Sequence, residues 1–161
     1  MDQTITLYHG SFMEVSKPKL LPHSRKHDSH DFGNGFYLTT SYKQAKNWAY
    51  RKSRLNTPVI NTFTFSFDHS LNIKKFKDNK EWLNYITMNR CRTFSIKDSY
   101  DIVIGPVADG SPIWTIIRDY NEGSITADNA LEQLLKSHNL FDQYAFKTNK
   151  ALKCLHYINK N

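Results

Sequence analysis

Hydrophobic and polar residues alternate most clearly between residues 59 and 67. In this stretch Val59, Phe63, Phe65 and Phe67 would lie on one face of a strand, and Thr62, Thr64 and Ser66 on the other. A period of two is typical of a half-buried β-strand. Shorter stretches of strand character lie at residues 4–9, 36–38, 100–107, 143–146 and at the end of the chain after residue 155.

Helical spacing appears in other segments. Ser41 followed by Gln44 predicts a capping box, and it is followed by a stripe of Ala45, Trp48 and Ala49. Residues 78–93 also predict a helix, Thr126 can cap another with the apolar face Ala130, Leu131, Leu134 and Leu135, and Ala151, Leu152 and Leu155 suggest a last short one. Residues 113–120 fit a helix or a strand.

A long loop and a turn are predicted between these elements. Residues 14–34 are polar, contain two prolines and three histidines, and predict a long loop of the kind that is usually functional or mobile. Asp109-Gly110 predicts a turn. Strands and helices mix without regular βαβ alternation, so the pattern predicts an α+β fold, with residues 1–161 as a single domain.

Composition adds limits on the class of protein. The chain has 161 residues, of which 14% are aromatic and 23% charged, and this balance is typical of a globular domain with a real core. The two cysteines, Cys91 and Cys154, have no zinc-site spacing and form no disulfide framework, although a disulfide between them stays open. No apolar run reaches membrane-spanning length and no signal pattern begins the chain, so we expect a cytoplasmic protein without membrane contact, with secretion by a signal-less route left open.

The positive charge is concentrated near the N-terminus. Residues 1–60 carry nine Lys or Arg against four acidic residues, so they contribute +5 of the net charge of +7. Such an excess would attract a pyrophosphate or a nucleic-acid backbone, and its alternative is an ordinary solvated basic surface.

The segment from Asp31 to Ser41 holds two glycines, two adjacent aromatic residues and the helix cap just described, and it follows the sequence His9-Gly10-Ser11 at the end of the first predicted strand. Each part alone has an ordinary explanation, because a histidine at a strand end is often structural and Gly-x-Gly is often a turn. Together they predict a pocket that stacks a flat ring and hydrogen-bonds an amide.

These motifs resemble the ADP-ribosyltransferases of the diphtheria-toxin-like and poly(ADP-ribose)-polymerase-like type, and within them small bacterial domains of unknown function. The resemblance rests on Leu7-Tyr-His9-Gly10-Ser11, on Phe32-Gly33-Asn34-Gly35-Phe36-Tyr37-Leu38, and more weakly on Gln143-Tyr144-Ala145-Phe146. It implies a split pair of β-sheets around an NAD cleft, with His9, Tyr37 and Gln143 as the catalytic residues. NAD would be the substrate, and no metal is expected.

The resemblance also implies a role for each residue. Tyr37 would stack the nicotinamide, a contact worth about 0.5–1.5 kcal/mol beyond area burial. The backbone of Gly10 would hold the carboxamide, because a residue without Cβ lets a ligand approach closely, and His9 would bind the adenosine ribose. The remaining residues expected to contact NAD are Ser11, Arg25, Gly35 and Trp48. Trp48 has an alternative place in the helix core, and Arg25 with Lys26 would lie nearest the phosphates.

Gln143 departs from the family pattern, which has Glu at this position. A glutamine can hydrogen-bond the ribose 2′-hydroxyl but cannot accept a proton at neutral pH. Elongation into poly(ADP-ribose) is therefore not expected, whereas mono-transfer to a protein or nucleic acid is. The alternatives are an inactive module that binds NAD or ADP-ribose, and a basic nucleic-acid-binding domain. Asp142 is adjacent, but strand alternation would turn its side chain away from the cleft.

Two further expectations remain. His23, His27 and His30 with Asp28 and Asp31 could be imagined as a metal site, but Pro22 and the polar context argue against the helix that would align them. The resemblance also implies a toxin, an effector or a toxin–antitoxin component, with an antitoxin protein as a possible partner.

Overall fold

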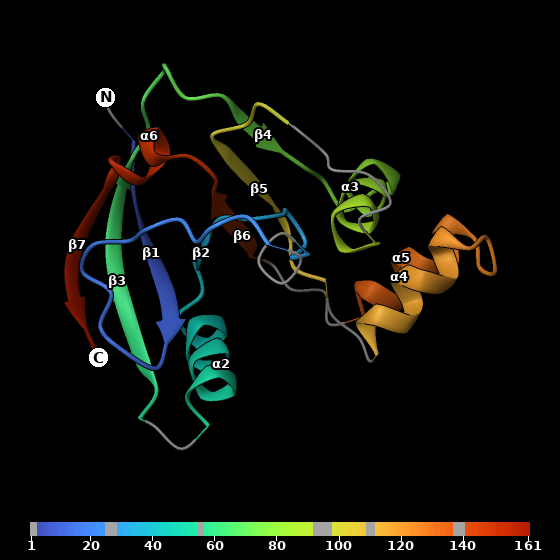
Figure 1. Ribbon diagram of the computed structural model, residues 1–161, viewed down its shortest axis with the longest axis horizontal. Helices are drawn as coiled ribbons and strands as arrows, with labels where there is room; N and C mark the ends of the chain where they lie inside the picture. Colours follow the sequence, from blue (N-terminus) through green and yellow to red (C-terminus); the bar gives the residue numbers. More distant parts are fainter. Residues whose placement is uncertain (1–2, 25–28, 55–56, 92–97, 109–111, 137–140) are drawn as a thin grey trace.

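The computed structural model describes residues 3–24, 29–54, 57–91, 98–108, 112–136 and 141–161, and every structural statement below refers to these residues. They contain one seven-stranded sheet in the order β4-β5-β6-β2-β1-β3-β7 (Figure 1). All neighbouring strands are antiparallel except β4 and β5, which are parallel. The strands are β1 (Thr4–Ser11), β2 (Phe36–Thr39), β3 (Val59–Ser66), β4 (Ile73–Lys75), β5 (Ile102–Pro106), β6 (Asp142–Phe146) and β7 (Leu155–Lys160).

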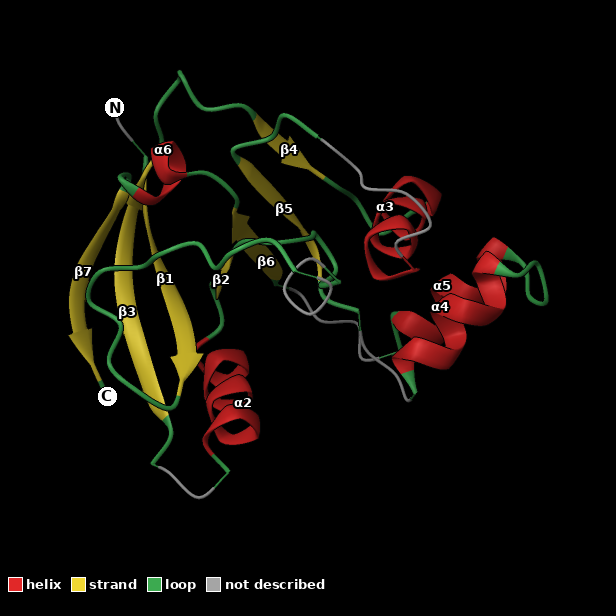
Figure 2. Ribbon diagram, in the orientation of Figure 1, coloured by secondary structure: helices red, strands yellow, loops and turns green. Residues whose placement is uncertain are grey.

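The described residues also contain five helices. They are α2 (Tyr42–Ser53), α3 (Lys80–Cys91), α4 (Ile113–Asn121), α5 (Ala127–Leu134) and α6 (Asn149–Leu152). Figure 2 shows α3, α4 and α5 gathered beyond the β4–β5–β6 part of the sheet, whereas α2 lies beside β1. The mixed α+β class predicted from the pattern is therefore confirmed, and residues 113–120, which were ambiguous, are helical.

One expectation about the sheet was wrong. The resemblance implied two separate sheets, but the described strands form a single sheet that joins β6, β2, β1 and β3. The joint between β1 and β2 is nevertheless narrow, because the two strands are in register at one pair alone, Tyr8 opposite Thr39. We call this joint between β1 and β2, which has a single paired position, the seam.

The structure contains the two helix N-caps that the sequence predicted. The hydroxyl of Ser41 accepts a hydrogen bond from the backbone N–H of Gln44, and Thr126 does the same for Asn129. The second half of the expected capping box is replaced, since the Ser41 N–H donates to the Thr39 hydroxyl. Both caps satisfy a backbone donor that a helix start leaves unpaired.

The sheet carries an apolar cluster on each face. On one face Leu7, Leu38, Phe63 and Phe146 belong to a core that also includes Leu155 of β7. On the other face the core includes Trp82 and Ile86 of α3, Ile117 of α4 and Leu134 of α5, packed on Val103 and Ala145. A sheet covered on both faces needs apolar residues at successive positions, as in Ile102, Val103 and Ile104 of β5.

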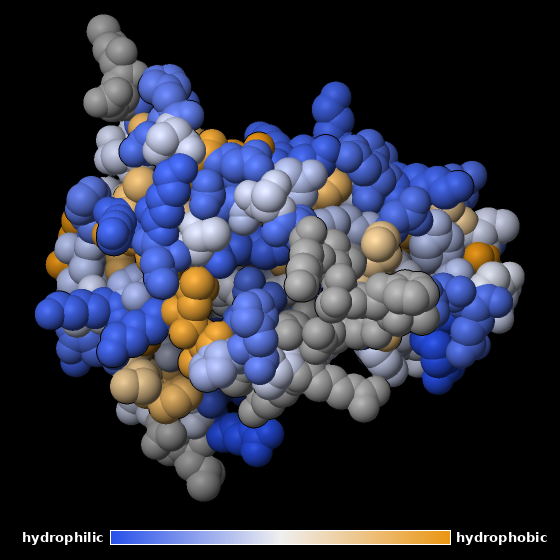
Figure 3. Space-filling view, turned by 45° about the horizontal axis from the view of Figure 1, so that its top comes forward, coloured by the Kyte–Doolittle hydropathy of each residue, from blue (hydrophilic) through white to orange (hydrophobic). Residues whose placement is uncertain are grey.

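Figure 3 shows one face of the molecule, on which hydrophilic residues dominate and hydrophobic atoms appear in several small groups. In the described part of the chain no helix is long and apolar enough to cross a membrane. Cys91 and Cys154 are separate thiols, so the disulfide that the sequence left open is absent.

Candidate functional site

The three residues expected to be catalytic lie on three adjacent strands at the centre of the sheet. His9 is on β1, Tyr37 on the neighbouring β2, and Gln143 on β6, which pairs with the other edge of β2. Their side chains do not share one face, however. Thr39 lies opposite both Tyr8 and Gln143, so Gln143 and Tyr37 point to one face and His9 to the other.

At the seam between β1 and β2, backbone groups lack the pairing that a regular ladder would give them. Continuing the register beyond Tyr8 and Thr39 would pair Gly10 with Tyr37, but no such pair is present in the described ladder. Instead, His9 Nδ1 lies 2.7 Å from the Tyr37 carbonyl oxygen and Lys52 Nζ lies 2.9 Å from the Gly10 carbonyl oxygen. Side chains therefore take the places that backbone partners would occupy in a closed sheet.

The direction of the Gly10 peptide groups follows from the other side of β1. Ile60 lies opposite Gly10, and both its N–H and its C=O are hydrogen-bonded to Asn161. In an antiparallel strand the N–H and C=O of one residue point to the same side. The backbone N–H and C=O of Ile60 thus point away from β1. Those of Gly10, which lies opposite, point away from β3 and towards the seam.

His9 is held as a neutral imidazole of defined tautomer. Its side chain is buried and stacks on Phe36 with ring centroids 4.1 Å apart. Burial first, and the nearby Lys52 ammonium second, lower the pKa of His9 from 6.5 to about 3, against the opposing effect of the hydrogen bond to Tyr37. A carbonyl oxygen can only accept, so Nδ1 must carry the proton, and Nε2 is left as an acceptor.

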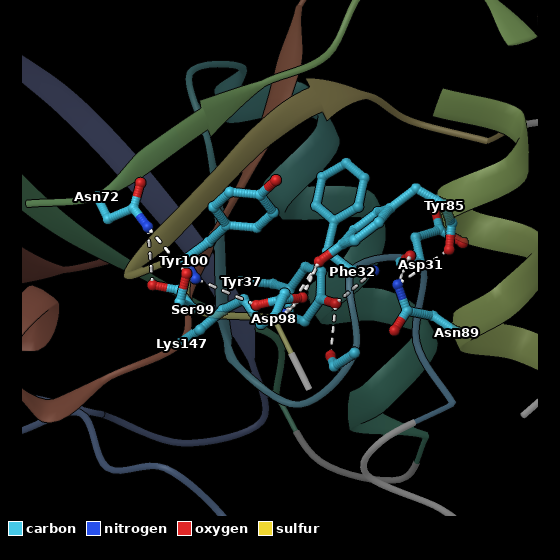
Figure 4. A network of polar contacts seen from close by, with 11 residues as sticks. Asp31, Phe32, Tyr37, Asn72, Tyr85, Asn89, Asp98, Ser99, Tyr100 and Lys147 are labelled. Carbon is cyan, nitrogen blue, oxygen red and sulfur yellow. Dashed lines mark hydrogen bonds and ion pairs between the residues drawn. The ribbon is translucent and has the colours of Figure 1, made fainter. Parts of the chain in front are cut away.

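Tyr37 is tied into the preceding loop by its hydroxyl group. The Tyr37 hydroxyl donates to the Gly33 carbonyl at 2.7 Å and accepts from the Phe32 N–H at 2.9 Å (Figure 4). Burial, with a further contribution from the Asp31 charge, raises the pKa of this phenol well above its ordinary value. The centre of the Tyr37 ring lies 5.6 Å from that of the His30 ring, which is tilted to it, and 6.5 Å from that of the Phe32 ring, which is stacked. The hydroxyl therefore fixes the ring against the Gly33 turn.

The reason for the glycine at position 10 differs from the one expected. A Cβ at Gly10 would lie 2.0 Å from the Ala45 carbonyl oxygen and 2.8 Å from the Ala49 nitrogen, both in α2. The missing side chain lets α2 pack against β1, and does not by itself open space for a ligand. Gly35 is similar, since a Cβ there would lie 3.1 Å from the Phe146 carbonyl oxygen.

Ser11, Trp48 and Arg25 were also expected to contact NAD. Ser11 is buried at the end of β1, on the same face as His9. Trp48 is half-buried on α2, whose fully buried residues are Ala45, Ala49 and Ser53. Arg25, Lys26, His27 and Asp28 lie outside the described residues. Among the described residues no three or more His, Cys, Asp or Glu side chains are grouped so that they could hold a metal ion.

Gln143 is buried and has both of its amide hydrogens engaged. Its Nε2 donates to Asp31 Oδ2 at 3.0 Å and to the Pro106 carbonyl oxygen at 3.1 Å. Asp142 alternates to the other face, as expected, and lies 3.9 Å from Lys75 Nζ. Gln143 thus connects the start of β6 to the segment of residues 31–35 before β2, which we call the aromatic loop.

The match to protein families covers nearly the whole chain. Residues 5–157 match the model of the family described as "Protein of unknown function (DUF3990)". The chain belongs to this family. The matched range includes His9, Tyr37 and Gln143, so the seam is part of the DUF3990 domain. No curated protein and no solved structure matches the chain.

Several residues of this DUF3990 domain were missed by sequence reasoning. Asp31 pairs with Arg90, and Asn89 donates to the Asp31 carbonyl and to the Tyr85 carbonyl. A second network joins the Tyr85 hydroxyl, Asp98 and Lys147, with Lys147 Nζ 2.7 Å from Asp98 Oδ2 (Figure 4). Asp31 stood beside the Gly-x-Gly motif and could have been noticed there, whereas no local pattern links it to Arg90, 59 residues away.

Proposed function

We propose that this protein is a mono-ADP-ribosyltransferase that uses NAD as its substrate. In the reaction the bond between nicotinamide and ribose C1′ breaks, nicotinamide leaves with the bonding electron pair, and an acceptor atom bonds to C1′. The acceptor gives up one proton to solvent, so the products are ADP-ribosyl acceptor, nicotinamide and a proton. Because nicotinamide leaves as a neutral ring, its departure needs no proton donor.

The observation that supports this proposal is the seam between β1 and β2. There the polar backbone groups of Gly10 face the edge of β2 next to Tyr37, and the carbonyls on both sides are hydrogen-bonded by side chains. A carboxamide carries one acceptor and two donors, and the backbone N–H and C=O of Gly10, which face the seam, are a matching donor and acceptor. Lys52 would have to release the Gly10 carbonyl, or share it, when a carboxamide binds.

The proposed chemistry assigns one task to each neighbouring side chain. Tyr37 offers a ring fixed by its hydroxyl, which favours stacking of a flat heterocycle. His9 Nε2 is an acceptor suited to a ribose hydroxyl, because the imidazole is neutral at physiological pH. Holding NAD in a fixed geometry would supply most of the rate enhancement, since no covalent protein intermediate is required.

The test is release of nicotinamide from NAD by the purified full chain. Tyr37→Leu removes the ring and should abolish release, whereas Tyr37→Phe keeps the ring and should retain part of it. Tyr120→Leu is the matched control, because Tyr120 lies on α4 and hydrogen-bonds Asn84. Thermal unfolding of each variant separates loss of the ring from loss of the fold.

The alternative of a binding module predicts a different result. The wild-type chain would bind NAD, measured by calorimetry, and release no nicotinamide with or without a cell lysate. That result would remove the enzyme proposal, and Gln143 would then be the residue that explains it, because an amide cannot take a proton from an acceptor.

A basic surface on α2 favours a nucleic acid as the acceptor. Lys43, Lys46 and Arg51 are exposed on this helix, which has no acidic residue. Tyr42 and Tyr50 are also exposed, and Lys46 Nζ lies 6.0 Å from the Tyr50 ring centre. Cations neutralise phosphates and exposed tyrosines stack on bases in single strands.

This acceptor class is tested with adenylate-labelled NAD and a cell lysate. Label should be lost after nuclease treatment, and Lys43→Glu with Lys46→Glu should reduce labelling while nicotinamide release into water continues. Label that persists on protein would overturn the nucleic-acid acceptor. A role as a toxin or effector, with an antitoxin partner, belongs to the same proposal and would appear as growth arrest on expression that Tyr37→Leu relieves.

A further inference from the structure

The side-chain amide of Gln143 has a defined orientation. Its Nε2 contacts Asp31 Oδ2 and the Pro106 carbonyl oxygen, and both of these atoms only accept hydrogen bonds. A rotated amide would place Oε1 against the same two acceptors and would be repelled by them. The NH₂ group must therefore face Asp31 and Pro106, and Oε1 must point away from both.

Asp31 is itself held in place from two directions. Arg90 Nε lies 2.5 Å from Asp31 Oδ1, so the guanidinium takes the oxygen that Gln143 does not use. Asn89 Nδ2 donates to the Asp31 backbone carbonyl at 3.1 Å, and this fixes the loop on which the carboxylate sits. The Asp31 residue is 6% exposed, so water does not compete strongly for these contacts.

We propose that Asp31, oriented by Arg90, is a positioning residue that makes Gln143 present Oε1 as the hydrogen-bond acceptor for a hydroxyl of the bound ligand. This inference rests on the proposed function, in which the hydroxyl is the 2′-hydroxyl of the nicotinamide ribose. It also explains how a glutamine works at this position, because Asp31 makes an otherwise two-sided amide act as an acceptor only, as one oxygen of a glutamate would.

The inference has a consequence for the reverse change, Gln143→Glu. A glutamate at this position would place a second carboxylate within hydrogen-bond distance of Asp31, and two carboxylates this close cannot both ionise without strong repulsion. The pair would hold one proton at low pH and lose it as the pH rises. The glutamate typical of the resembling family should thus be unfavourable here at neutral pH.

The contact is tested first, by stability and without any substrate. In Gln143→Glu the introduced carboxyl should have a higher pKa in the folded than in the unfolded state. The free energy of unfolding of the variant should therefore be closest to that of the wild type at pH 4–5 and fall below it as the pH rises towards 8. Adding Asp31→Asn should reduce this fall, because the double variant again has one carboxylate and one amide. The part that remains comes from the Pro106 carbonyl oxygen, which the introduced carboxylate faces in both variants. Asp101→Asn is the control for loss of a buried carboxylate elsewhere, since Asp101 is buried and hydrogen-bonded to Asn72 and Thr148.

The positioning role is tested by the kinetics of nicotinamide release. In Asp31→Asn the new amide would turn its oxygen to Arg90 and its NH₂ to Gln143, so Oε1 would be drawn away from the ligand. We expect kcat to fall about tenfold or more, the scale of one misplaced hydrogen bond, with KM changed much less. The double variant should not restore the wild-type kcat, because the glutamate oxygen that accepts from the introduced asparagine also faces the Pro106 carbonyl oxygen, which repels it.

The outcomes separate the two proposals. A Gln143→Glu chain whose stability relative to the wild type does not change with pH would overturn the Asp31–Gln143 contact and leave the transferase proposal standing. A wild-type chain that shows the contact but releases no nicotinamide would overturn the proposed function and, with it, the positioning role. Unchanged kcat in Asp31→Asn, in an active protein with the contact established, would overturn the positioning role alone.

Discussion

The neutral His9 predicts a steep loss of stability in acid. In the unfolded chain this histidine protonates with a pKa near 6.5, whereas burial and the Lys52 charge lower its pKa in the folded chain to about 3. Between these values the unfolded state binds a proton that the folded state does not. Folding stability from this residue is therefore complete above pH 7 and falls as the pH drops.

The magnitude follows from the shift. One pKa unit corresponds to about 1.4 kcal/mol, so each pH unit below about 6 should cost about that much, and about 5 kcal/mol in total by pH 3. Domains of this size are stable by roughly 5–15 kcal/mol. The single imidazole should thus set much of the acid unfolding midpoint.

The assay is urea unfolding followed by tryptophan fluorescence between pH 4 and 7.5. His9→Asn is the reference variant, because its amide can still donate to the Tyr37 carbonyl but cannot titrate. Carboxylates titrate in both proteins, so their contributions cancel in the difference. The advantage of the wild type over the variant should shrink by about 1.4 kcal/mol for each pH unit below 6.

Two parallel stability curves would refute this reasoning. They would mean that His9 keeps an ordinary pKa in the folded state, and hence that its ring is hydrated or paired with an anion. In that case Nε2 would be protonated in mild acid, which would contradict the acceptor role that we propose for it towards a ribose hydroxyl.

Three further substitutions test two contacts near the seam and one helix cap, each by chemical or thermal unfolding. Gly10→Ala should cost more than about 3 kcal/mol, because its Cβ would lie 2.0 Å from the Ala45 carbonyl oxygen; a loss below about 1 kcal/mol would show that α2 can move away. Tyr37→Phe should cost about 2 kcal/mol, since the Phe32 N–H loses its acceptor, and an unchanged midpoint would contradict the assigned contact. Thr126→Ala should cost about 1 kcal/mol through loss of the α5 cap, and no change would mean that the helix start frays in the wild type.

The elements of the fold that sequence reasoning found are those with a strong local pattern. Alternation predicted a strand at 59–67, and the structure has β3 at Val59–Ser66. In contrast, β4 has only three residues, Ile73–Lys75, and lies parallel to β5. Such a strand is stabilised by its partner and not by its own pattern, so nothing in the local sequence revealed it.

The same distinction applies to the buried polar residues. Asn61 interrupts the apolar face predicted for β3, and its residue is fully buried. Its amide donates to the Met13 carbonyl and accepts from the Val15 N–H, which holds the long loop after β1 against the sheet. These partners are far away in the chain, and a pattern confined to a strand could not identify them.

For the candidate site, the sequence correctly predicted which segments would become strands, and the structure adds that the strands bearing His9, Tyr37 and Gln143 are neighbours. Sequence reasoning did not predict that the His9 side chain lies on the opposite face from the other two. The face of the sheet on which a side chain lies, relative to those of neighbouring strands, depends on the register between the strands. The register of β1 and β2 is defined by one pair. It also missed Lys52 and Asp31, whose contacts depend on how α2 and the aromatic loop pack.

A structural role and a binding role for His9 need not exclude each other. Nδ1 satisfies the Tyr37 carbonyl at the seam, and a closed β1–β2 ladder would have done so without any side chain. Using an imidazole there costs the burial of a titratable group, and the described β1–β2 ladder has no pair at Gly10. The cost is understandable if the edge must stay open for a ligand and if Nε2, fixed as an acceptor by the same hydrogen bond, contacts that ligand. The structural contact of one ring nitrogen would then determine what the other nitrogen can bind.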